Sequence, residues 1–291
     1  MRTKPLSRPH RSLPLAGENK AAITALAVGC LLLFVFLLAA VAPSAFAPYS
    51  PSDTFDAWLP SSSDHILGTD DAGADVFTSL VYATGRTLLT GVASAALALA
   101  LGVLVGLAAG SGGVIGALAN GVINLFAMIP KLPATIVIAA FAGGGLAETV
   151  IVIAVFGWVT TARAVRAKVL HIKCRPFADA LTAAGYSPAR IAFRHIIPNT
   201  GEVILTRYIT TLAGCIMTEA TLSFLGLGSV SSPTWGTMIN LAYRRGGFAM
   251  EAYGWLLAPG AAIMLLALAF WCLWYFAEHR SRDVSGKSYA D

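Results

Sequence analysis

The sequence predicts an all-α polytopic membrane protein with six transmembrane helices. Of its 291 residues, 56% are hydrophobic and only 12% are charged, with a mean hydropathy of +0.71, whereas a soluble domain carries about 25% charged residues. The positive charges are spread over termini and loops, which is a topology signal and argues against nucleic acid as a partner. The four cysteines lie far apart, so we expect no disulfide framework, no metal site and no cofactor.

Six apolar stretches are the predicted transmembrane helices. The first is an uncharged run that is long enough to cross a hydrocarbon core of about 30 Å. Small residues are frequent in the second, which lets helices approach one another closely. The predicted spans are residues 21–42, 87–110, 114–142, 149–161, 203–217 and 253–276.

The charges outside these spans predict the orientation. Residues 1–20 are strongly basic and residues 278–291 add three Lys or Arg, whereas residues 43–85 contain six aspartates and no Lys or Arg. Because basic segments stay in the cytoplasm, we expect both termini inside and residues 43–85 outside, followed by a core at residues 86–277. Basic residues also cluster between the fourth and fifth spans, which predicts that the loop at residues 174–199 is cytoplasmic.

The longest polar interruption in the second half of the chain lies within that loop, from Arg175 to Asn199. Residues 177–184 favour a short helix, Gly185 can cap its C-terminus, and Pro188 can open a second helix that re-enters the membrane. Composition alone is equally compatible with an ordinary cytoplasmic loop. The order of the residues favours the two-helix interpretation.

This order resembles the "EAA" loop of bacterial ABC importer permeases. The residues that carry the resemblance are Asp179, Ala180, Leu181, Gly185, His195, Ile197, Pro198 and Asn199. Asp179 replaces the Glu of the family, and Thr182 replaces a common Arg. The resemblance implies a coupling helix seated in a groove of a separate ATPase subunit. The expected coupling residues are Asp179, Ala180, Ala183, Gly185, His195, Pro198 and Asn199.

The acidic outer segment contains a second motif, HILGTDDAGADVF, at residues 65–77. Gly68 and Gly73 allow positive φ, and Asp70 and Asp71 can accept hydrogen bonds from nearby backbone N–H groups. A metal site that includes His65 is the less favoured alternative to such a solvated turn segment.

The same segment resembles C-type permeases of the dipeptide, oligopeptide and nickel importer family. The matching residues are His65, Leu67, Gly68, Thr69, Asp70, Gly73, Asp75 and Val76, and Ala74 replaces an Arg. Two blocks after the fifth span resemble the same subfamily, at Glu219, Leu222, Ser223, Phe224, Leu225, Gly226, Leu227 and Gly228 and at Pro233, Trp235, Gly236 and Met238. Near these blocks, Arg244 and Arg245 are exceptions to the charge rule on the expected outer side.

The resemblance covers about residues 20–270 and implies the type I ABC importer permease (MetI-like) fold in the bacterial inner membrane. It also implies four kinds of partner: a second permease subunit, two ATP-binding subunits, an extracytoplasmic substrate-binding protein and membrane lipid. The binding protein is expected to face His65, Asp70, Asp75 and Trp235. The implied cargo is a di- or oligopeptide, and nickel or a metal chelate stays open as the alternative.

Three polar residues in or beside the spans are candidates for the translocation pathway: Asn124, Lys131 and Glu219. Two prolines flank Lys131, and their freed backbone carbonyls would be costly against lipid, so this segment is expected to face protein or water. A Lys131 that snorkels from a helix end is an equal alternative. Glu219 either lines the pathway or caps a helix.

The chain shows no chemistry of its own that would supply energy. Gly286-Lys287-Ser288 imitates the end of a phosphate-binding loop, but Ser281 stands where that loop needs Gly. No nucleophile and base stand at a recognisable catalytic spacing, so we expect a transport subunit that is not an enzyme. A proton-coupled secondary transporter and a membrane scaffold are the rival classes. The end of the sixth span, around Trp271, also departs from the family pattern. Together with Ala74, Asp179 and Thr182, it allows a divergent subgroup with an unusual substrate or partner.

Overall fold

A computed structural model describes residues 16–174, 181, 183–186, 188–191, 194, 197–229 and 232–287. The regular structure of these residues is helical, apart from one antiparallel bridge between Thr69 and Asp75. The helices are α1 (Ala16–Val41), the 3-10 turn η1 (Pro43–Ala45), α2 (Val76–Ser111), α3 (Gly113–Met128), α4 (Lys131–Ala142), α5 (Leu146–Gly157), α6 (Val159–Lys173), α8 (Pro188–Ile191), α9 (Ile197–Phe224), α10 (Trp235–Arg244) and α11 (Tyr253–Lys287).

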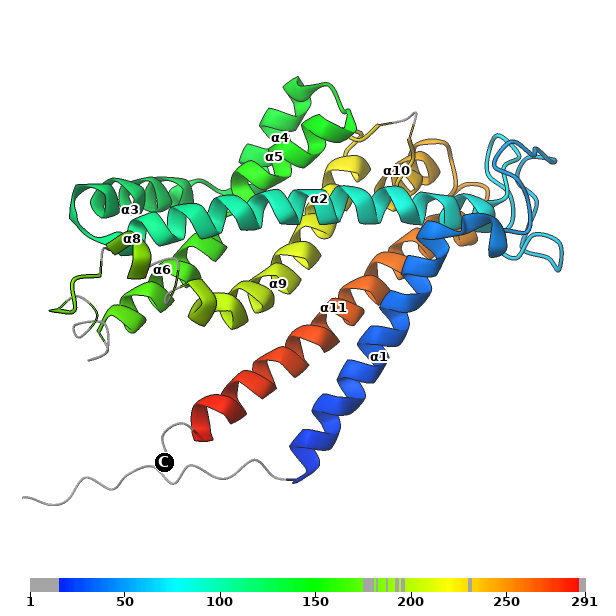
Figure 1. The fold of residues 1–291 in the computed structure, drawn as a ribbon. Coiled ribbons are helices and arrows are strands. Elements are labelled where there is room, and N and C mark those ends of the chain that lie inside the picture. Colours follow the sequence, from blue (N-terminus) through cyan, green and yellow to red (C-terminus); the bar gives the residue numbers. More distant parts are fainter. Residues whose placement is uncertain are drawn as a thin grey trace, which may run out of the picture.

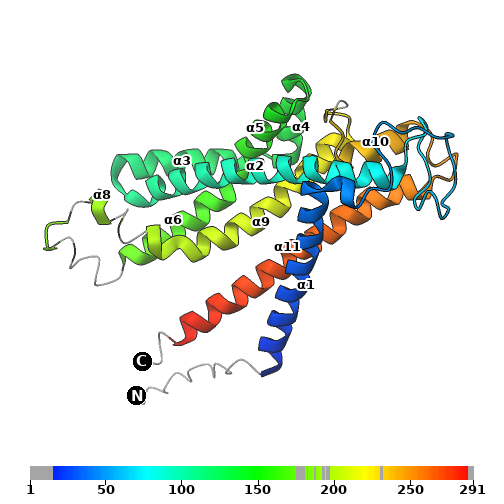
Figure 2. The same cartoon turned by 45° about the vertical axis from the view of Figure 1, so that its right-hand side comes forward.

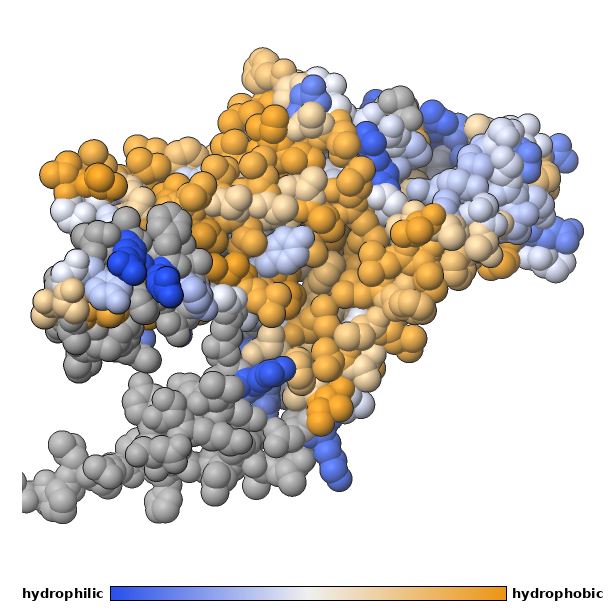
Figure 3. All heavy atoms as spheres, viewed as in Figure 1, coloured by the Kyte–Doolittle hydropathy of each residue, from blue (hydrophilic) through white to orange (hydrophobic). Residues whose placement is uncertain are grey.

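The helices form an elongated bundle along α2. The segment that connects α1 with α2 lies at one end of the molecule, and α8 lies near the other end (Figures 1 and 2). α1 packs along α11, while α6 and α9 pack along α2. Figure 3 shows that hydrophobic residues cover the middle of the visible face, whereas hydrophilic ones gather at the end formed by the segment before α2. This distribution is typical of a membrane-embedded protein.

Among the described residues, three helices are long and apolar enough to cross a membrane: Lys20–Val41, Val76–Ser111 and Tyr253–Arg280. Two bent helix pairs, α3 with α4 and α5 with α6, raise this number to five if each pair is one span. α9 is not among them, because polar residues such as Arg207 and Glu219 lower its mean hydropathy. Six spans are therefore not confirmed, although the all-helical fold class is.

The predicted span at residues 114–142 is broken. α3 ends at Met128 and α4 begins at Lys131, with an angle of 87° between them. Ile129 is extended, with φ −78° and ψ 124°, as expected for a residue that precedes a proline. Pro130 and Pro133 therefore lie at the break and in the first turn of α4, where a missing N–H costs little.

Two other predicted spans also differ from the helices in the structure. The predicted span at residues 149–161 contains the junction of α5 and α6, which meet at 42°. α2 begins eleven residues before the predicted start at residue 87, because Asp75 caps it and the polar residues of its first turns are buried within the protein.

The close approach of helices that small residues predicted is confirmed for α2 and α6. Gly102, Gly106 and Gly110 follow one another at intervals of four along α2, on one face of the helix. A Cβ atom at Gly106 would lie 2.7 Å from the Ala162 carbonyl oxygen, and one at Gly102 would lie 2.8 Å from that of Trp158. Only glycine lets the two backbones meet here.

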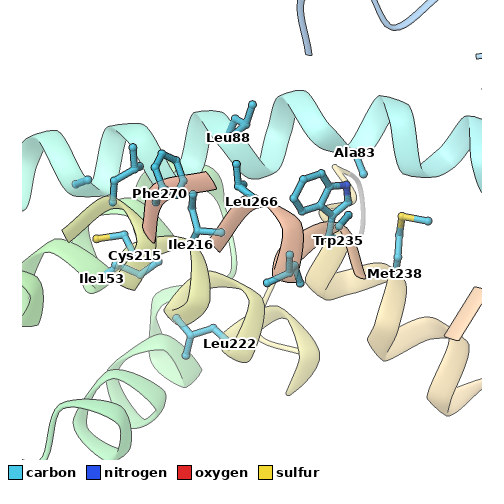
Figure 4. Close-up of a cluster of buried hydrophobic side chains, with 14 of the residues drawn as sticks. Ala83, Leu88, Ile153, Cys215, Ile216, Leu222, Trp235, Met238, Leu266 and Phe270 are labelled. Atoms are coloured by element: carbon cyan, nitrogen blue, oxygen red, sulfur yellow. The ribbon is translucent and has the colours of Figure 1, made fainter. Parts of the chain in front are cut away.

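The main hydrophobic core lies where α2, α9, α10 and α11 meet (Figure 4). Trp235 fills its centre and is fully buried. Its indole N–H donates to the Leu80 carbonyl oxygen at 3.1 Å, and its backbone N–H donates to Thr87 Oγ1 at 3.1 Å. Phe36 of α1 packs on the indole, with 5.3 Å between the ring centroids. Trp235 thus ties α10 to α2 and α1.

Candidate functional site

The turn motif before α2 has the geometry that its sequence predicts. Gly68 and Gly73 have φ of +77° and +79°, which confirms the expected positive φ. Asp70 Oδ1 accepts hydrogen bonds from the backbone N–H groups of Ala72 at 2.9 Å and Ala74 at 2.8 Å. Burial raises the pKa of the Asp70 carboxyl, and these two hydrogen bonds oppose that change.

His65 and Asp75 hold this motif on the start of α2. His65 Nδ1 lies 3.0 Å from Asp75 Oδ1, and Asp75 Oδ2 accepts from the Thr78 backbone N–H at 2.7 Å. Asp75 is therefore the N-cap of α2. The His65 ring contacts the rings of Tyr49 and Phe55. The motif is thereby locked to the helix through buried polar contacts.

The four residues expected to face a binding protein differ in their exposure. His65, Asp75 and Trp235 are buried, with 6%, 3% and 0% of their surfaces exposed, and Asp70 is half-buried. Their direct contact with a partner stays a prediction, and the exposed residues around them form the available surface. No three His, Cys, Asp or Glu side chains of the described chain are grouped as metal ligands.

Asp71 has a partner that the local sequence does not indicate. Instead of a nearby backbone group, it binds Arg245 between α10 and α11, with Arg245 Nη1 at 3.0 Å from Oδ1 and 2.9 Å from Oδ2. This ion pair joins the motif to a segment that lies 174 positions further along the chain. Of the two arginines on the expected outer side, Arg245 is therefore paired with a carboxylate.

Arg244 and Arg245 also line a pocket of about 370 Å³ beside the end of α9. Sequence reasoning missed this pocket, although two arginines on an otherwise acidic side were a signal for it. The pocket is lined by Ser223, Gly226, Gly228, Thr237, Asn240, Leu241, Arg244 and Arg245.

Glu219 lies next to this pocket, in the last turns of α9. It is buried, with 1% of its surface exposed, and its Oε1 accepts from Ser223 Oγ at 2.6 Å. Its Oε2 has no hydrogen-bond partner in the described part of the protein. A cavity of about 10 Å³, room for about one water molecule, lies beside it. This cavity is lined by Arg86, Thr90, Gly144, Gly145, Leu146, Thr149, Glu219, Ser223, Gly228, Ser229, Ser232 and Thr234.

The other two pathway candidates lie on different helices. Asn124 is exposed on α3, and Lys131 is half-buried at the first residue of α4. No ion pair of Lys131 is found among the described residues. The structure therefore does not join Lys131 to Glu219 through an ion pair.

The expected coupling loop is described in part. Gly185 has φ +80°, as its predicted capping role requires, and α8 begins at Pro188 as expected. Ala183 and Pro198 are exposed, and Pro198 lies in the first turn of α9. Asp179, Ala180 and His195 lie outside the described residues, as does the burial of the Asn199 side chain.

One small apolar cluster attaches this loop to α6. Ile191 of α8 packs with Val165, Val169 and Ile172. At the end of α6, Lys173 Nζ donates to the Ser111 carbonyl oxygen at 2.6 Å. A cation at the C-terminus of α2 interacts favourably with the helix dipole. This contact holds the end of α6, on which Ile191 packs, against α2.

The helical bundle and its long apolar helices define a multi-pass membrane protein. The chain belongs to the family of binding-protein-dependent transport system inner membrane components, whose family model matches residues 98–282.

Curated relatives extend this likeness beyond the family model. The dipeptide transport system permease protein DppC of Bacillus subtilis is 35% identical over 228 residues, which cover 77% of this chain and 70% of the relative. The oligopeptide transport system permease protein OppC of the same organism is 34% identical, with 76% and 72% covered. The di/tripeptide transport system permease protein DppC of Pseudomonas aeruginosa is 32% identical, with 87% and 84% covered.

Proposed function

We propose that this chain is the permease subunit of an ATP-driven, binding-protein-dependent importer of di- or oligopeptides. The observation that carries the proposal is the likeness to three permeases named for peptide transport, over at least 70% of each relative. ATP is hydrolysed on separate subunits, and this chain forms half of the translocation pathway beside a second permease. An extracytoplasmic binding protein delivers the peptide.

In this proposal, the chain has six spans, and α9, which contains the predicted fifth span, completes that number. α9 packs against α2, α5, α10 and α11, and its polar Thr211, Thr218 and Glu219 are buried. A helix that is shielded from lipid by its neighbours tolerates polar residues at membrane depth. Both termini and the loop at residues 174–199 then lie in the cytoplasm, with residues 43–85 outside.

The loop at residues 174–199 contacts the ATPase subunit in this proposal. Support comes from the exposed Ala183, the left-handed Gly185 and the packing of Ile191 on α6. ATPase closure would move α8 and, through the apolar cluster, α6. Glu219 lines the pathway near its outer end, while Asn124 and Lys131 line it elsewhere.

Uptake by the reconstituted importer tests the proposal. The chain is placed in proteoliposomes with its partner permease, both ATPases and the binding protein, and ATP-dependent uptake of a labelled dipeptide is compared with that of Ni²⁺. We expect dipeptide uptake. Uptake of Ni²⁺ alone would move the assignment to a metal importer, and dipeptide uptake that follows a proton gradient without ATP would overturn the ABC class.

A pair of variants at one position tests the coupling loop. Gly185→Val places a β-branched residue at φ +80°, which strains the backbone. Asn tolerates this conformation far better, so Gly185→Asn is the matched control. We expect uptake and binding-protein-stimulated ATPase activity to fall together in Gly185→Val and to persist in Gly185→Asn. Full stimulated activity in Gly185→Val would exclude a coupling role for this turn.

A further inference from the structure

We propose that the pocket lined by Arg244 and Arg245 binds the terminal carboxylate of the peptide on its way to the buried Glu219. This inference rests on the proposed function, because it takes the cargo to be a peptide. The pocket of about 370 Å³ has the size of small-molecule sites in proteins, which begin at about 300 Å³. It lies at the same end of the bundle as the motif before α2, through the Asp71 to Arg245 ion pair.

Most polar groups of the pocket already have partners. Ser223 Oγ donates to Glu219, Thr237 Oγ1 donates to the Thr234 carbonyl oxygen, and the Asn240 amide donates to the Phe224 carbonyl oxygen. These bonds fix the walls of the pocket. The charged groups of the pocket are the guanidinium groups of Arg244 and Arg245.

The two arginines are not equivalent. Arg245 is held by both carboxylate oxygens of Asp71, which fixes its position and offsets its charge. Arg244 has no carboxylate partner among the described residues. A guanidinium matches a carboxylate with two parallel hydrogen bonds. Arg244 is therefore the group that receives the carboxylate, and Arg245 is a fixed wall.

The neighbouring cavity explains why a peptide fits better than a simple anion. Ser223 and Gly228 line both this pocket and the cavity beside Glu219, whose Oε2 has no hydrogen-bond partner in the described chain. A positive pocket therefore adjoins a buried acceptor. Because the cavity holds about one water molecule, an ammonium group of a ligand in the pocket reaches Glu219 through that water, whereas an anion without a hydrogen-bond donor has only the arginine as a partner.

Ligand binding to the complete permease and ATPase complex, without the binding protein, tests the pocket. The probes are a dipeptide with a free carboxylate and the same dipeptide with a C-terminal amide, followed by saturation-transfer NMR. We expect Arg244→Gln to weaken binding of the free acid about tenfold, as for the loss of a charge-assisted hydrogen bond, and to leave the amide unchanged. Arg244→Lys restores part of the preference because it keeps the charge.

Arg280→Gln is the matched control, since Arg280 is also exposed but lies near the other end of α11. It should bind the free acid as the wild type does. Equal binding of acid and amide by the wild type, or unchanged binding of the acid by Arg244→Gln, would overturn the proposal while leaving dipeptide uptake by the wild-type importer intact. Absence of uptake in the wild type would instead contradict the proposed function.

The carboxylate that pairs with Arg244 can belong to the peptide or to an acidic side chain of the binding protein. The docking affinity of the binding protein distinguishes these two sources. If Arg244→Gln weakens the docking of the ligand-free binding protein and leaves dipeptide binding unchanged, Arg244 pairs with an acidic side chain of that protein, and the proposal is wrong. Unchanged docking together with the weakened binding of the free acid supports it.

Discussion

The two ends of the molecule use similar turn residues in different surroundings. Gly73, in the motif before α2, and Gly185, in the loop before α8, have nearly the same φ, +79° and +80°. A Cβ atom at Gly73 would lie against the Phe55 carbonyl oxygen, whereas one at Gly185 would meet no atom of the described residues within 4 Å. The motif before α2 is packed into the protein, whereas Gly185 is exposed in the loop at the other end.

The burial of the motif residues follows the same division. His65 and Asp75 are buried and bound to each other, but Ala183 and Pro198 are exposed. A shared sequence motif can therefore mark a position that shapes the fold or one that meets a partner. The surroundings of each residue distinguish the two.

Alanine at the two glycines gives the largest expected difference. Gly185→Ala meets only the cost of left-handed backbone, about 1 to 2 kcal/mol. Gly73→Ala adds a collision with backbone, so we expect a loss of more than about 3 kcal/mol or failure of the segment before α2 to fold. Thermal unfolding of the purified variants measures both. Equal losses would contradict the division between the ends.

Removal of the α2 cap is expected to have the next largest effect. Asp75→Ala deletes the acceptor of the Thr78 N–H and the partner of His65, and should cost about 2 kcal/mol. Asp75→Asn keeps an acceptor and is the control with a smaller loss. If Asp75→Ala unfolds at the wild-type temperature, the buried network does not stabilise this end.

The ion pair between Asp71 and Arg245 should contribute less. The Arg245 side chain is 44% exposed and that of Asp71 24%, so solvent screens the pair and Asp71→Asn should cost about 0.5 kcal/mol. The difference from the wild type should shrink in high salt. A loss that salt leaves unchanged would show that packing, and not charge, joins the two segments.

Asp70 gives the smallest expected effect, through its pH dependence. Because burial raises the pKa of its carboxyl, the folded protein binds this proton more tightly than the unfolded chain does. The resulting stabilisation is present below the unfolded pKa of about 3.9 and is lost as the pH rises through the raised folded value. As the pH is lowered from 7 towards 4, the melting temperature of the wild type should therefore rise relative to that of Asp70→Asn. This variant keeps an acceptor for the N–H groups of Ala72 and Ala74. An identical pH profile in the variant would exclude this linkage.

Local features of the structure followed from the sequence, whereas long-range ones did not. Glycine at Gly68, Gly73 and Gly185 predicts positive φ because other residues are strained there, and a proline at position 188 predicts a helix start. The Asp71 to Arg245 ion pair joins residues 174 positions apart, for which no local pattern exists. Prolines 130 and 133 indicated a disturbed helix, but only packing could turn the disturbance into an 87° break.

The candidate site was predictable to a similar extent. Glu219 was singled out because a carboxylate is costly at membrane depth, and the structure places it beside a cavity. The pocket at Arg244 and Arg245 was missed because its walls come from α9, α10 and the segments after each of them, which meet only in the folded protein. The burial of Trp235 also depends on contacts with distant Leu80 and Thr87.

Site-directed cross-linking tests the central claim, that the loop before α9 meets the ATPase, most directly. The native cysteines are replaced, and a single cysteine is introduced by Ala183→Cys or by Ala72→Cys, which are exposed at the two ends. In the assembled importer, we expect Ala183→Cys to cross-link to the ATPase subunit and Ala72→Cys to leave it unlabelled. Cross-linking of the ATPase through Ala72→Cys, with none through Ala183→Cys, would contradict the account.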